Sequence, residues 1–309
     1  MSRTDPLVSI VIPVYNGANY LAEAIETALA QTYAHTELLV IDDGSTDDGA
    51  TSAVAQSFGG RVRYHRKANG GVSTALNTGI AMMRGDYFSW LSHDDRYLPG
   101  KIAAQVDFLR SHPGVQALAT GLEVIDDNGQ VTSRYSSGEV KTLRNGRDVM
   151  DHWVYGCSLL IHRDVFARCG TFNESNRTVQ DLEMWLAMVH GGVPITMMPD
   201  VLCQWRHHGE SDSFRLRPAH FAEVDAFLER IATTYPLTFF AKEAGEPTRR
   251  DSLDIYEWLA QQAMHRGSPR RAFAFYKRAL AAYPNVLDLS FWKTLRRYVA
   301  SHRLAAHVR

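Results

Sequence analysis

Short strand-like runs alternate with amphipathic segments along the first part of the chain. The run Leu7–Tyr15 is almost entirely β-branched or aromatic, which suits a strand buried on both faces of a parallel sheet. Three further strand-like segments follow it, at residues 37–41, 61–65 and 86–91. Between them, apolar residues recur at helical spacing, as in Leu21, Ile25 and Leu29. This alternation predicts a parallel sheet wound by right-handed crossover helices.

The pattern changes after Pro99. Residues 115–125 and 130–135, joined by Asp127-Asn128-Gly129, predict a hairpin that adds antiparallel strands to the sheet. Further elements are expected as strands at residues 155–161 and 195–206 and as a helix at residues 181–190. The first part of the chain is therefore expected to be an α/β domain with a mixed sheet.

From about Arg215 onward the apolar residues follow helical spacing alone. The helices are expected at residues 221–235, 252–264, 268–283 and 286–308. The sequence thus predicts an α/β domain over residues 1–214 and a C-terminal α-helical region over residues 215–309.

The last of these helices is basic and amphipathic. One side carries Leu289, Trp292, Leu295 and Val299, and the cations lie largely elsewhere, at Lys293, Arg296, Arg297 and Arg303. Such a helix more often packs its apolar stripe on its own protein, and we favour that interpretation. The alternative is peripheral contact with an anionic membrane surface.

Composition and charge narrow the class of protein. The chain has 309 residues, of which 45% are hydrophobic and 22% charged, as in an ordinary globular protein. Its net charge of −1 gives no electrostatic argument for binding nucleic acid. Three widely spaced cysteines form no zinc pattern, and we recognise no secretory signal and no apolar run of about 18 residues. A cytoplasmic location is expected.

Polar clusters follow each of the first four strands. They are Pro13-Val14-Tyr15-Asn16, Asp42-Asp43-Gly44-Ser45, Lys67-Ala68-Asn69-Gly70-Gly71 and His93-Asp94-Asp95. In a parallel sheet these strand ends share one edge, so the clusters should meet in one cleft. Paired carboxylates there suit a hard divalent cation held against a phosphorylated substrate, although the Asp pair alone would more often be an acidic turn before a helix. No P-loop and no GxGxxG motif occurs.

As a set, these motifs resemble the family 2 glycosyltransferases with the GT-A fold. The resemblance covers residues 12–33, 37–47, 68–80 and 85–102 and extends, in order and spacing, to near Ser213. It implies a Rossmann-like, mostly parallel sheet with an antiparallel addition. It also implies transfer of a sugar from a nucleotide diphosphate, here expected to be UDP, to an acceptor hydroxyl with inversion. The implied cofactor is Mn²⁺ or Mg²⁺, and the acceptor is a glycan, a lipid-linked molecule or a protein.

The resemblance assigns the nucleotide site to the first three clusters. Pro13 and Tyr15 would border the base, and Asp43 would accept a hydrogen bond from it, as a carboxylate can from the imide of uracil or thymine. Asn69 and Gly71 would lie in a loop close to the nucleotide. On local sequence alone, Asp43 is more simply a turn or cap residue, and the Asn-Gly-Gly segment a turn.

The metal site is assigned to the fourth cluster. Asp94 would be the main ligand and a contact to the nucleotide, and Asp95 a second ligand. Ser92 stands where many members of the family have another Asp. Trp205–Ser213 resembles a motif in which Arg206 or His208 would reach the diphosphate and His208 would complete the metal shell.

The resemblance also supplies a general base. In Gln180-Asp181-Leu182-Glu183-Met184-Trp185, Asp181 would accept the proton of the acceptor hydroxyl, with Gln180 in place of the family's Glu. Glu183 is a weaker candidate for the base or for a contact with the acceptor. A helix N-cap is an equally good interpretation of Asp181 on local sequence.

Two other functions remain open. A sugar nucleotidyltransferase would usually bring a basic glycine-rich loop after the first strand, where this chain has PVYNGANYL. A non-catalytic scaffold that binds nucleotide sugars would fit Ser92 and Gln180, but it has no use for the base.

Overall fold

The first strand, β1 (Val8–Val14), lies at the centre of the parallel part of the sheet, and all seven of its residues are buried. The computed structural model describes residues 5–152, 154–209, 217–242, 247–285 and 289–307. Strand β1 pairs in parallel with β2 (Thr36–Asp42) on one side and β4 (Tyr87–Trp90) on the other, and β3 (Arg63–Arg66) continues the sheet beyond β2. The expected parallel half of the sheet is confirmed.

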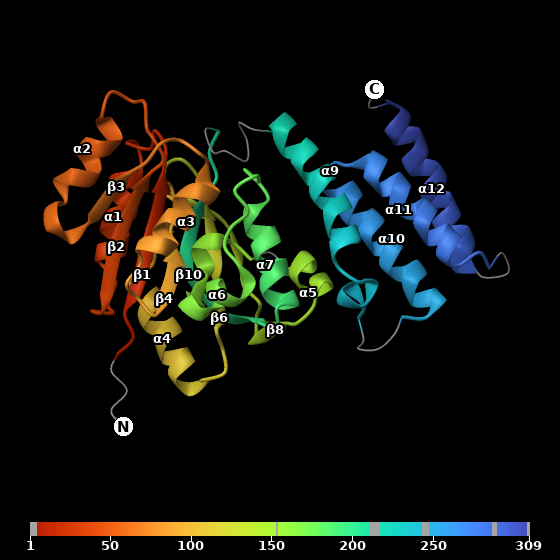
Figure 1. Ribbon diagram of the computed structural model, residues 1–309, viewed down its shortest axis with the longest axis horizontal. Helices are drawn as coiled ribbons and strands as arrows, with labels where there is room; N and C mark the ends of the chain where they lie inside the picture. Colours follow the sequence, from red (N-terminus) through yellow and green to blue (C-terminus); the bar gives the residue numbers. More distant parts are fainter. Residues whose placement is uncertain (1–4, 153, 210–216, 243–246, 286–288, 308–309) are drawn as a thin grey trace. The chain divides into compact units, whose positions relative to one another are not determined.

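Three helices pack on one face of β1 because its alternate side chains are all apolar. Val8, Ile10, Ile12 and Val14 join one core with residues of α1 (Leu21–Leu29), α2 (Ala50–Ser57) and α4 (Lys101–Ser111). Helix α3 (Val72–Met82) contacts β1 and β2 as well (Figure 1). The helix crossovers bring the carboxyl ends of β1, β2, β3 and β4 to one edge, as the pattern predicts.

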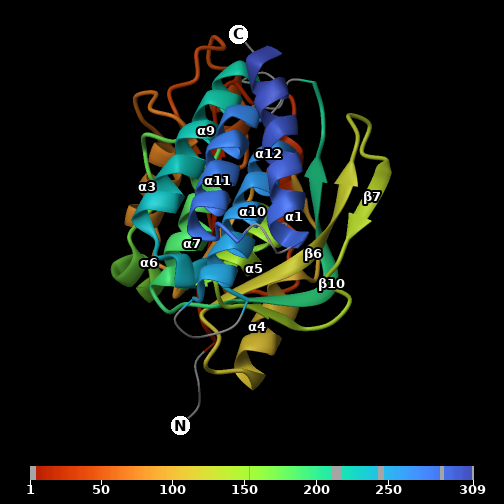
Figure 2. The ribbon, with the colours of Figure 1, turned by 90° about the vertical axis from the view of Figure 1, so that its right-hand side faces the viewer.

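The other half of the sheet is mixed. Its order continues from β4 through β9 (Leu160–His162), β6 (Ala117–Ile125) and β10 (Ile195–Arg206) to β5 (Arg96–Tyr97). The expected hairpin is present, with β7 (Val131–Tyr135) antiparallel to β6 (Figure 2). Short strand β8 (Lys141–Leu143) pairs with the start of β10. Helices α6 (Arg163–Cys169) and α7 (Gln180–His190) complete this half.

One expected strand is shorter than its apolar run. Residues 155–161 were expected to be extended throughout, but Gly156–Ser158 forms a 3₁₀ turn and the strand begins only at Leu160. The turn is closed by the backbone N–H of Ser158, which donates to Tyr155 O, and by the Ser158 hydroxyl, which donates to the same oxygen. An apolar run does not reveal such a turn.

The C-terminal helices form a second unit with its own core. They are α9 (Arg217–Thr234), α10 (Arg249–His265), α11 (Pro269–Ala282) and α12 (Leu289–His307), with a 3₁₀ turn at Leu237–Phe240. Phe227, Leu259 and Phe275 are fully buried in it. Helices α10, α11 and α12 lie side by side (Figures 1 and 2). None of the described helices combines the length and apolar character needed to cross a membrane.

This second unit also takes a segment from the middle of the chain. The two units comprise Met1–Arg144 with Trp153–Phe214, and Asn145–His152 with Arg215–Arg309. Helix α5 (Gly146–Asp151) docks through Arg147, whose Nε donates to Phe240 O at 3.1 Å, and through Asp151, which accepts from Trp258 Nε1. The sequence placed these residues in the first unit, because a six-residue helix has too few turns to show a period.

A buried lysine connects three elements of the sheet unit. Lys101, at the start of α4, is fully buried, and its Nζ donates to Ser89 Oγ at 3.1 Å and to Gln105 Oε1 at 2.9 Å. Its ammonium also lies 4.2 Å from the centre of the Tyr97 ring. Burial lowers the pKa of Lys101 to about 8. The folded state therefore binds the Lys101 proton less tightly than the unfolded chain does.

We predict that Lys101 makes stability rise with pH in alkaline solution. Between pH 8 and 10.5 the unfolded chain retains a proton that the folded protein has lost, so the free energy of unfolding increases with pH across that window. Compared with Lys101→Met, the wild type should gain about 3 kcal/mol over this range. Chemical denaturation at a series of pH values measures the difference, and a difference that stays constant would contradict the prediction.

Candidate active site

The ends of β1 and β2 are joined by the side chain of Asn16. Its backbone is left-handed (φ +50°), its Oδ1 accepts from Thr46 N at 2.7 Å, and its own backbone N–H donates to Ser45 Oγ at 2.9 Å. Beside it, Tyr15 is 37% exposed, and its hydroxyl lies 3.5 Å from Thr46 Oγ1. Pro13 is buried within β1. Of the two residues expected to border a base, Tyr15 thus offers an accessible ring at the strand end.

Asp43 holds the glycine loop that follows β3. Its carboxylate, 4% exposed, accepts from Gly71 N at 2.6 Å, from Gly70 N at 3.0 Å and from Lys67 Nζ at 2.7 Å. Asn69 adds a bond from its Nδ2 to the Asp43 carbonyl at 2.9 Å. The structure therefore brings Asp43, Asn69 and Gly71 together, as expected. It also shows that the Asp43 carboxylate already accepts hydrogen bonds from the loop.

Gly44 lets the ends of β2 and β3 approach each other. Its φ is +77°, and a Cβ at this position would lie only 2.7 Å from the backbone nitrogen of Asn69. A larger residue would push the loop away from Asp43. Asp43 and Gly44 after β2 thus determine the position of the loop that follows β3.

The turn after β4 presents Asp94 to His208. Asp94 Oδ2 lies 2.9 Å from His208 Nε2, and the two side chains are 15% and 6% exposed. Burial by itself would raise the pKa of Asp94, but the charges of His93 and His208 and the hydrogen bond to His208 outweigh it, so the pKa is lowered. The pair joins the end of β4 to the end of β10. The other residues of that motif, at 210–213, lie outside the described residues.

The first strand end closes against the same turn. A Cβ at Gly17 would lie 2.3 Å from Cδ2 of His93, so only glycine allows this contact. The loop after β1 and the acidic turn after β4 are therefore in contact, as the shared sheet edge predicts.

Asp95, expected to be a second metal ligand, instead points toward β10. It is 3% exposed and accepts from the backbone N–H of Arg206 at 2.9 Å. Its pKa is raised well above the usual value, first by burial and then by the charge of Asp94. The structure thus assigns Asp95 to the connection between the turn and β10, and it does not extend the Asp94–His208 pair.

Arg206 is likewise committed within the protein. It is 1% exposed; its Nε donates to Asp94 O at 2.9 Å, one terminal nitrogen to Asp126 O at 3.0 Å, and the other to Glu23 Oε2 at 2.5 Å. Its guanidinium also lies 4.5 Å from the centre of the Tyr20 ring. The expectation that Arg206 reaches a diphosphate is wrong for this structure, because every nitrogen of the guanidinium already binds a protein acceptor.

These contacts define which residues can hold a metal. Within the described ranges no three His, Cys, Asp or Glu side chains are grouped to bind one. Asp94 and His208 supply one carboxylate oxygen and one imidazole nitrogen side by side. This small donor set fits a divalent cation that takes its remaining ligands from water and phosphate oxygens.

Asp181 lies in the first turn of α7, where the N-cap position belongs to Val179. The N-cap interpretation of Asp181 is therefore wrong, although the positive end of the helix still favours its ionised form. Glu183 is bound by the side-chain amides of Asn173, at 3.3 Å, and Asn176. Glu183 thus orders the loop before α7, which makes it the weaker candidate for a base.

The loop before α7 packs on α3. Ser73 Oγ donates to Asn176 O at 3.0 Å, and Asn77 Nδ2 donates to Phe172 O at 2.9 Å. Helix α3 begins directly after Gly71, so the segment that carries Asp181 is anchored to the helix that starts at the glycine loop.

Tyr155 relates Asp181 to the acidic turn. Its pKa is raised, mainly by burial and then by nearby negative charges that include those of Asp181 and Asp95. Both carboxyl groups therefore lie within electrostatic reach of one phenol, whose ring packs 5.0 Å from that of Trp205. No pattern in the sequence identified Tyr155, since its place depends on the 3₁₀ turn that follows it.

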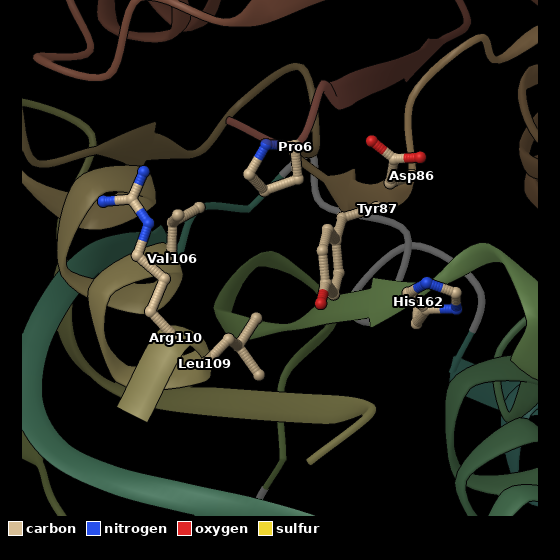
Figure 3. A pocket seen from close by; sticks show the side chains of 7 residues that line it. All are labelled: Pro6, Asp86, Tyr87, Val106, Leu109, Arg110 and His162. Atoms are coloured by element: carbon tan, nitrogen blue, oxygen red, sulfur yellow. The ribbon is translucent and has the colours of Figure 1, made fainter. Parts of the chain in front are cut away.

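A pocket at the opposite edge of the sheet is separate from this site. Its volume is about 290 Å³, and Figure 3 shows Pro6, Asp86, Tyr87 and His162 among its lining residues. Pro6 precedes β1 and Tyr87 begins β4, so the pocket lies at the amino ends of the strands. It contains none of the residues that the sequence assigned to the site.

Sequence comparison places this geometry in a family context. The family model described as "Glycosyl transferase family 2" matches residues 9–170. An uncharacterized glycosyltransferase of Rickettsia felis is 43% identical over 217 residues, which are 68% of this chain and 36% of that protein. The chain spans about a third of the length of this and the next two Rickettsia relatives. A putative teichuronic acid biosynthesis glycosyltransferase, TuaG of Bacillus subtilis, is 26% identical over 67% of this chain and 81% of that protein.

Solved structures show the same fold. S. aureus TarS superposes with a TM-score of 0.57 at 15% identity, over 96% of this chain and 55% of that one. TarS 1-349 in complex with UDP-GlcNAc gives a TM-score of 0.56 at 14% identity, over 96% of this chain and 81% of that one. At this identity the similarity concerns the fold, and it confirms the expected GT-A architecture.

We predict that Arg206 is essential for stability. Arg206→Met would leave the Glu23 carboxylate and the carbonyl groups of Asp94, Asp126 and Asp127 without their cation. It should lower the free energy of unfolding by about 3–5 kcal/mol. Arg206→Lys keeps the charge but not the planar guanidinium, so its free energy of unfolding should lie between those of the wild type and Arg206→Met. Denaturant titration measures both.

The matched control is Arg134→Met. Arg134 is 67% exposed and also forms an ion pair, with Glu123 at 2.5 Å, so its removal should change stability by about 1 kcal/mol or less. Equal decreases in the free energy of unfolding for Arg206→Met and Arg134→Met would contradict the prediction. The buried contacts of Arg206 would then stabilise the protein no more than an exposed ion pair does.

Proposed function

The chain belongs to glycosyl transferase family 2, and we propose that it transfers a sugar from UDP to an acceptor hydroxyl with inversion at the anomeric carbon. The observation that carries this proposal is that the Asp94–His208 pair and the loop held by Asp43 follow the carboxyl ends of parallel strands at one edge of the sheet, and that the charges of Asp181 and Asp95 both act on Tyr155. This edge of the sheet would then offer a base-binding surface, a diphosphate site and a proton acceptor.

The donor nucleotide would lie over the ends of β1 and β2. Tyr15 supplies an exposed ring for the base, and the glycine loop supplies backbone close to the ribose and phosphates. The solved TarS complex contains UDP-GlcNAc, which supports a UDP-sugar as the donor class here. A hydrogen bond from the base to Asp43 would add to the bonds that this carboxylate already accepts from the loop.

The diphosphate would lie beside Asp94 and His208. These two residues would hold Mn²⁺ or Mg²⁺, which neutralises the charge that develops on the leaving diphosphate. The protein's own part is to keep both donors in place, through the bonds that Arg206 donates to the Asp94 carbonyl and to the Asp95 carboxylate. Ser92 leaves this site with fewer carboxylates than many relatives have.

Asp181 would act as the general base. Its carboxylate accepts the proton of the acceptor hydroxyl while that oxygen bonds to the anomeric carbon and the bond to the diphosphate oxygen breaks on the opposite side. Binding both substrates in line supplies the rest of the rate enhancement by proximity.

The acceptor would be a glycan, a lipid-linked molecule or a protein in the synthesis of surface glycan or polysaccharide. The name of TuaG supports this assignment. A scaffold that only binds nucleotide sugars is the main alternative. It is distinguished by turnover, because a scaffold would release no UDP from UDP-sugars.

We predict that release of UDP from UDP-sugars requires a divalent metal and Asp94. Removal of metal with EDTA should abolish release and Mn²⁺ should restore it, while Asp94→Asn should lower kcat by about a hundredfold or more. Asp200→Asn, at an exposed carboxylate of β10, is the control and should retain full activity. Activity that survives both EDTA and Asp94→Asn would exclude the metal site.

We predict that Asp181→Asn separates binding from catalysis. Transfer to the acceptor should fall by about 10²- to 10⁴-fold because the base is lost, while UDP binding measured by calorimetry should stay unchanged. Glu183→Gln keeps the hydrogen-bond acceptor for the asparagines and should retain most activity. Full transfer by Asp181→Asn would show that another residue takes the proton.

A further inference from the structure

The last helix of the chain, α12, packs on its own unit through polar and aromatic side chains among those that the structure describes. Thr294 is fully buried and its hydroxyl donates to Glu257 Oε1 at 2.6 Å, and Ser301 is 2% exposed. Tyr298 stacks on Phe273 with ring centres 4.6 Å apart. The favoured expectation that the helix packs its apolar stripe on its own protein is therefore wrong for Trp292 and Val299.

Trp292 and Val299 lie on the opposite side of α12. They are 50% and 44% exposed, and their spacing of seven residues places them about two turns apart on one face. By the same spacing Arg296 lies between them, and Lys293 lies beside them; both are exposed. This face of α12 is therefore both apolar and basic.

The charged residues of α12 itself are all cations. The sequence of α12 contains no Asp or Glu, and Arg297 forms an ion pair with Glu257 of α10 at 3.0 Å. The outward face thus combines an indole, an aliphatic side chain and at least two cations. This is the combination that binds at the headgroup level of an anionic membrane, where indole rings reside and cations meet lipid phosphates.

We propose that the outward face of α12, defined by Trp292, Lys293, Arg296 and Val299, docks on the surface of an anionic bilayer. The indole and the valine insert at the level of the headgroups, and the cations pair with lipid phosphates. A second copy of the chain is a poorer occupant, because a two-fold contact through this face would gather the cations of both copies in one interface to which α12 brings no acidic residue. The proposal is independent of the transfer reaction.

The test is co-sedimentation of the full chain with vesicles of phosphatidylcholine, either pure or with about 30% phosphatidylglycerol. The protein should bind the anionic vesicles and hardly bind the neutral ones. Binding should weaken as ionic strength is raised, because screening shortens the reach of the cations. Equal binding to both kinds of vesicle, or binding to neither, would overturn the proposal.

Variants then locate the surface. Trp292→Ser should lower the partition coefficient by roughly tenfold or more, and Lys293→Gln with Arg296→Gln by about fivefold for each cation removed. Lys277→Gln, at an exposed cation of α11, is the matched control and should leave binding unchanged. Unchanged thermal unfolding and unchanged UDP release show that the variants are folded.

Two results would contradict the assignment. If Trp292→Ser and the double Gln variant bind as the wild type does, another surface contacts the lipid. If sedimentation equilibrium shows a dimer that Trp292→Ser dissociates, the face is an interface between copies of the chain.

Discussion

The candidate site depends on one buried cation. Arg206 is almost fully buried near the end of β10, where its guanidinium binds Asp94 O, the carbonyl of Asp126 in the hairpin turn and the carboxylate of Glu23 in α1. A buried guanidinium is stable only when its donors are matched by acceptors, so its presence fixes four segments relative to one another. Asp94 and His208 are the residues that this constraint places side by side. The Asp94–His208 contact thus depends on the buried ion pair of Arg206 with Glu23.

A second carboxylate, that of Asp43, acts in the same way after β2. Asp43 binds two consecutive backbone N–H groups of the glycine loop and the ammonium of Lys67. In both places, buried charges shape the loops, while the groups proposed to meet substrate remain accessible or half-buried. Tyr15, Asp94 and Asp181 are the accessible or half-buried groups, and Arg206 and Asp95 are the buried ones. This division explains why adjacent residues such as Asp94 and Asp95 have opposite shifts in pKa.

Much of the fold and part of the site followed from the sequence. The apolar run of β1, the hairpin after Ile125 and the clustering of polar segments at one sheet edge depend on local periodicity and on the geometry of parallel sheets, and these were predicted correctly. The directions of individual side chains were not predicted from the sequence. Arg206 meets acceptors on segments far away in sequence, and no local pattern says that its nitrogens are already occupied. Helix α5 and the inverted packing of α12 were missed because both depend on tertiary contacts, through Arg147 and Thr294.

The central claim is that Arg206 positions Asp94 and His208 to hold a metal against the diphosphate. The most direct measurement is a crystal structure of the full chain grown with UDP and Mn²⁺. The account predicts one metal ion bound to Asp94, His208 and the diphosphate, with the uracil beside Tyr15 and Arg206 keeping its bond to the Asp94 carbonyl. Nucleotide bound at the opposite edge of the sheet, or a metal ion bound without Asp94 and His208, would contradict it.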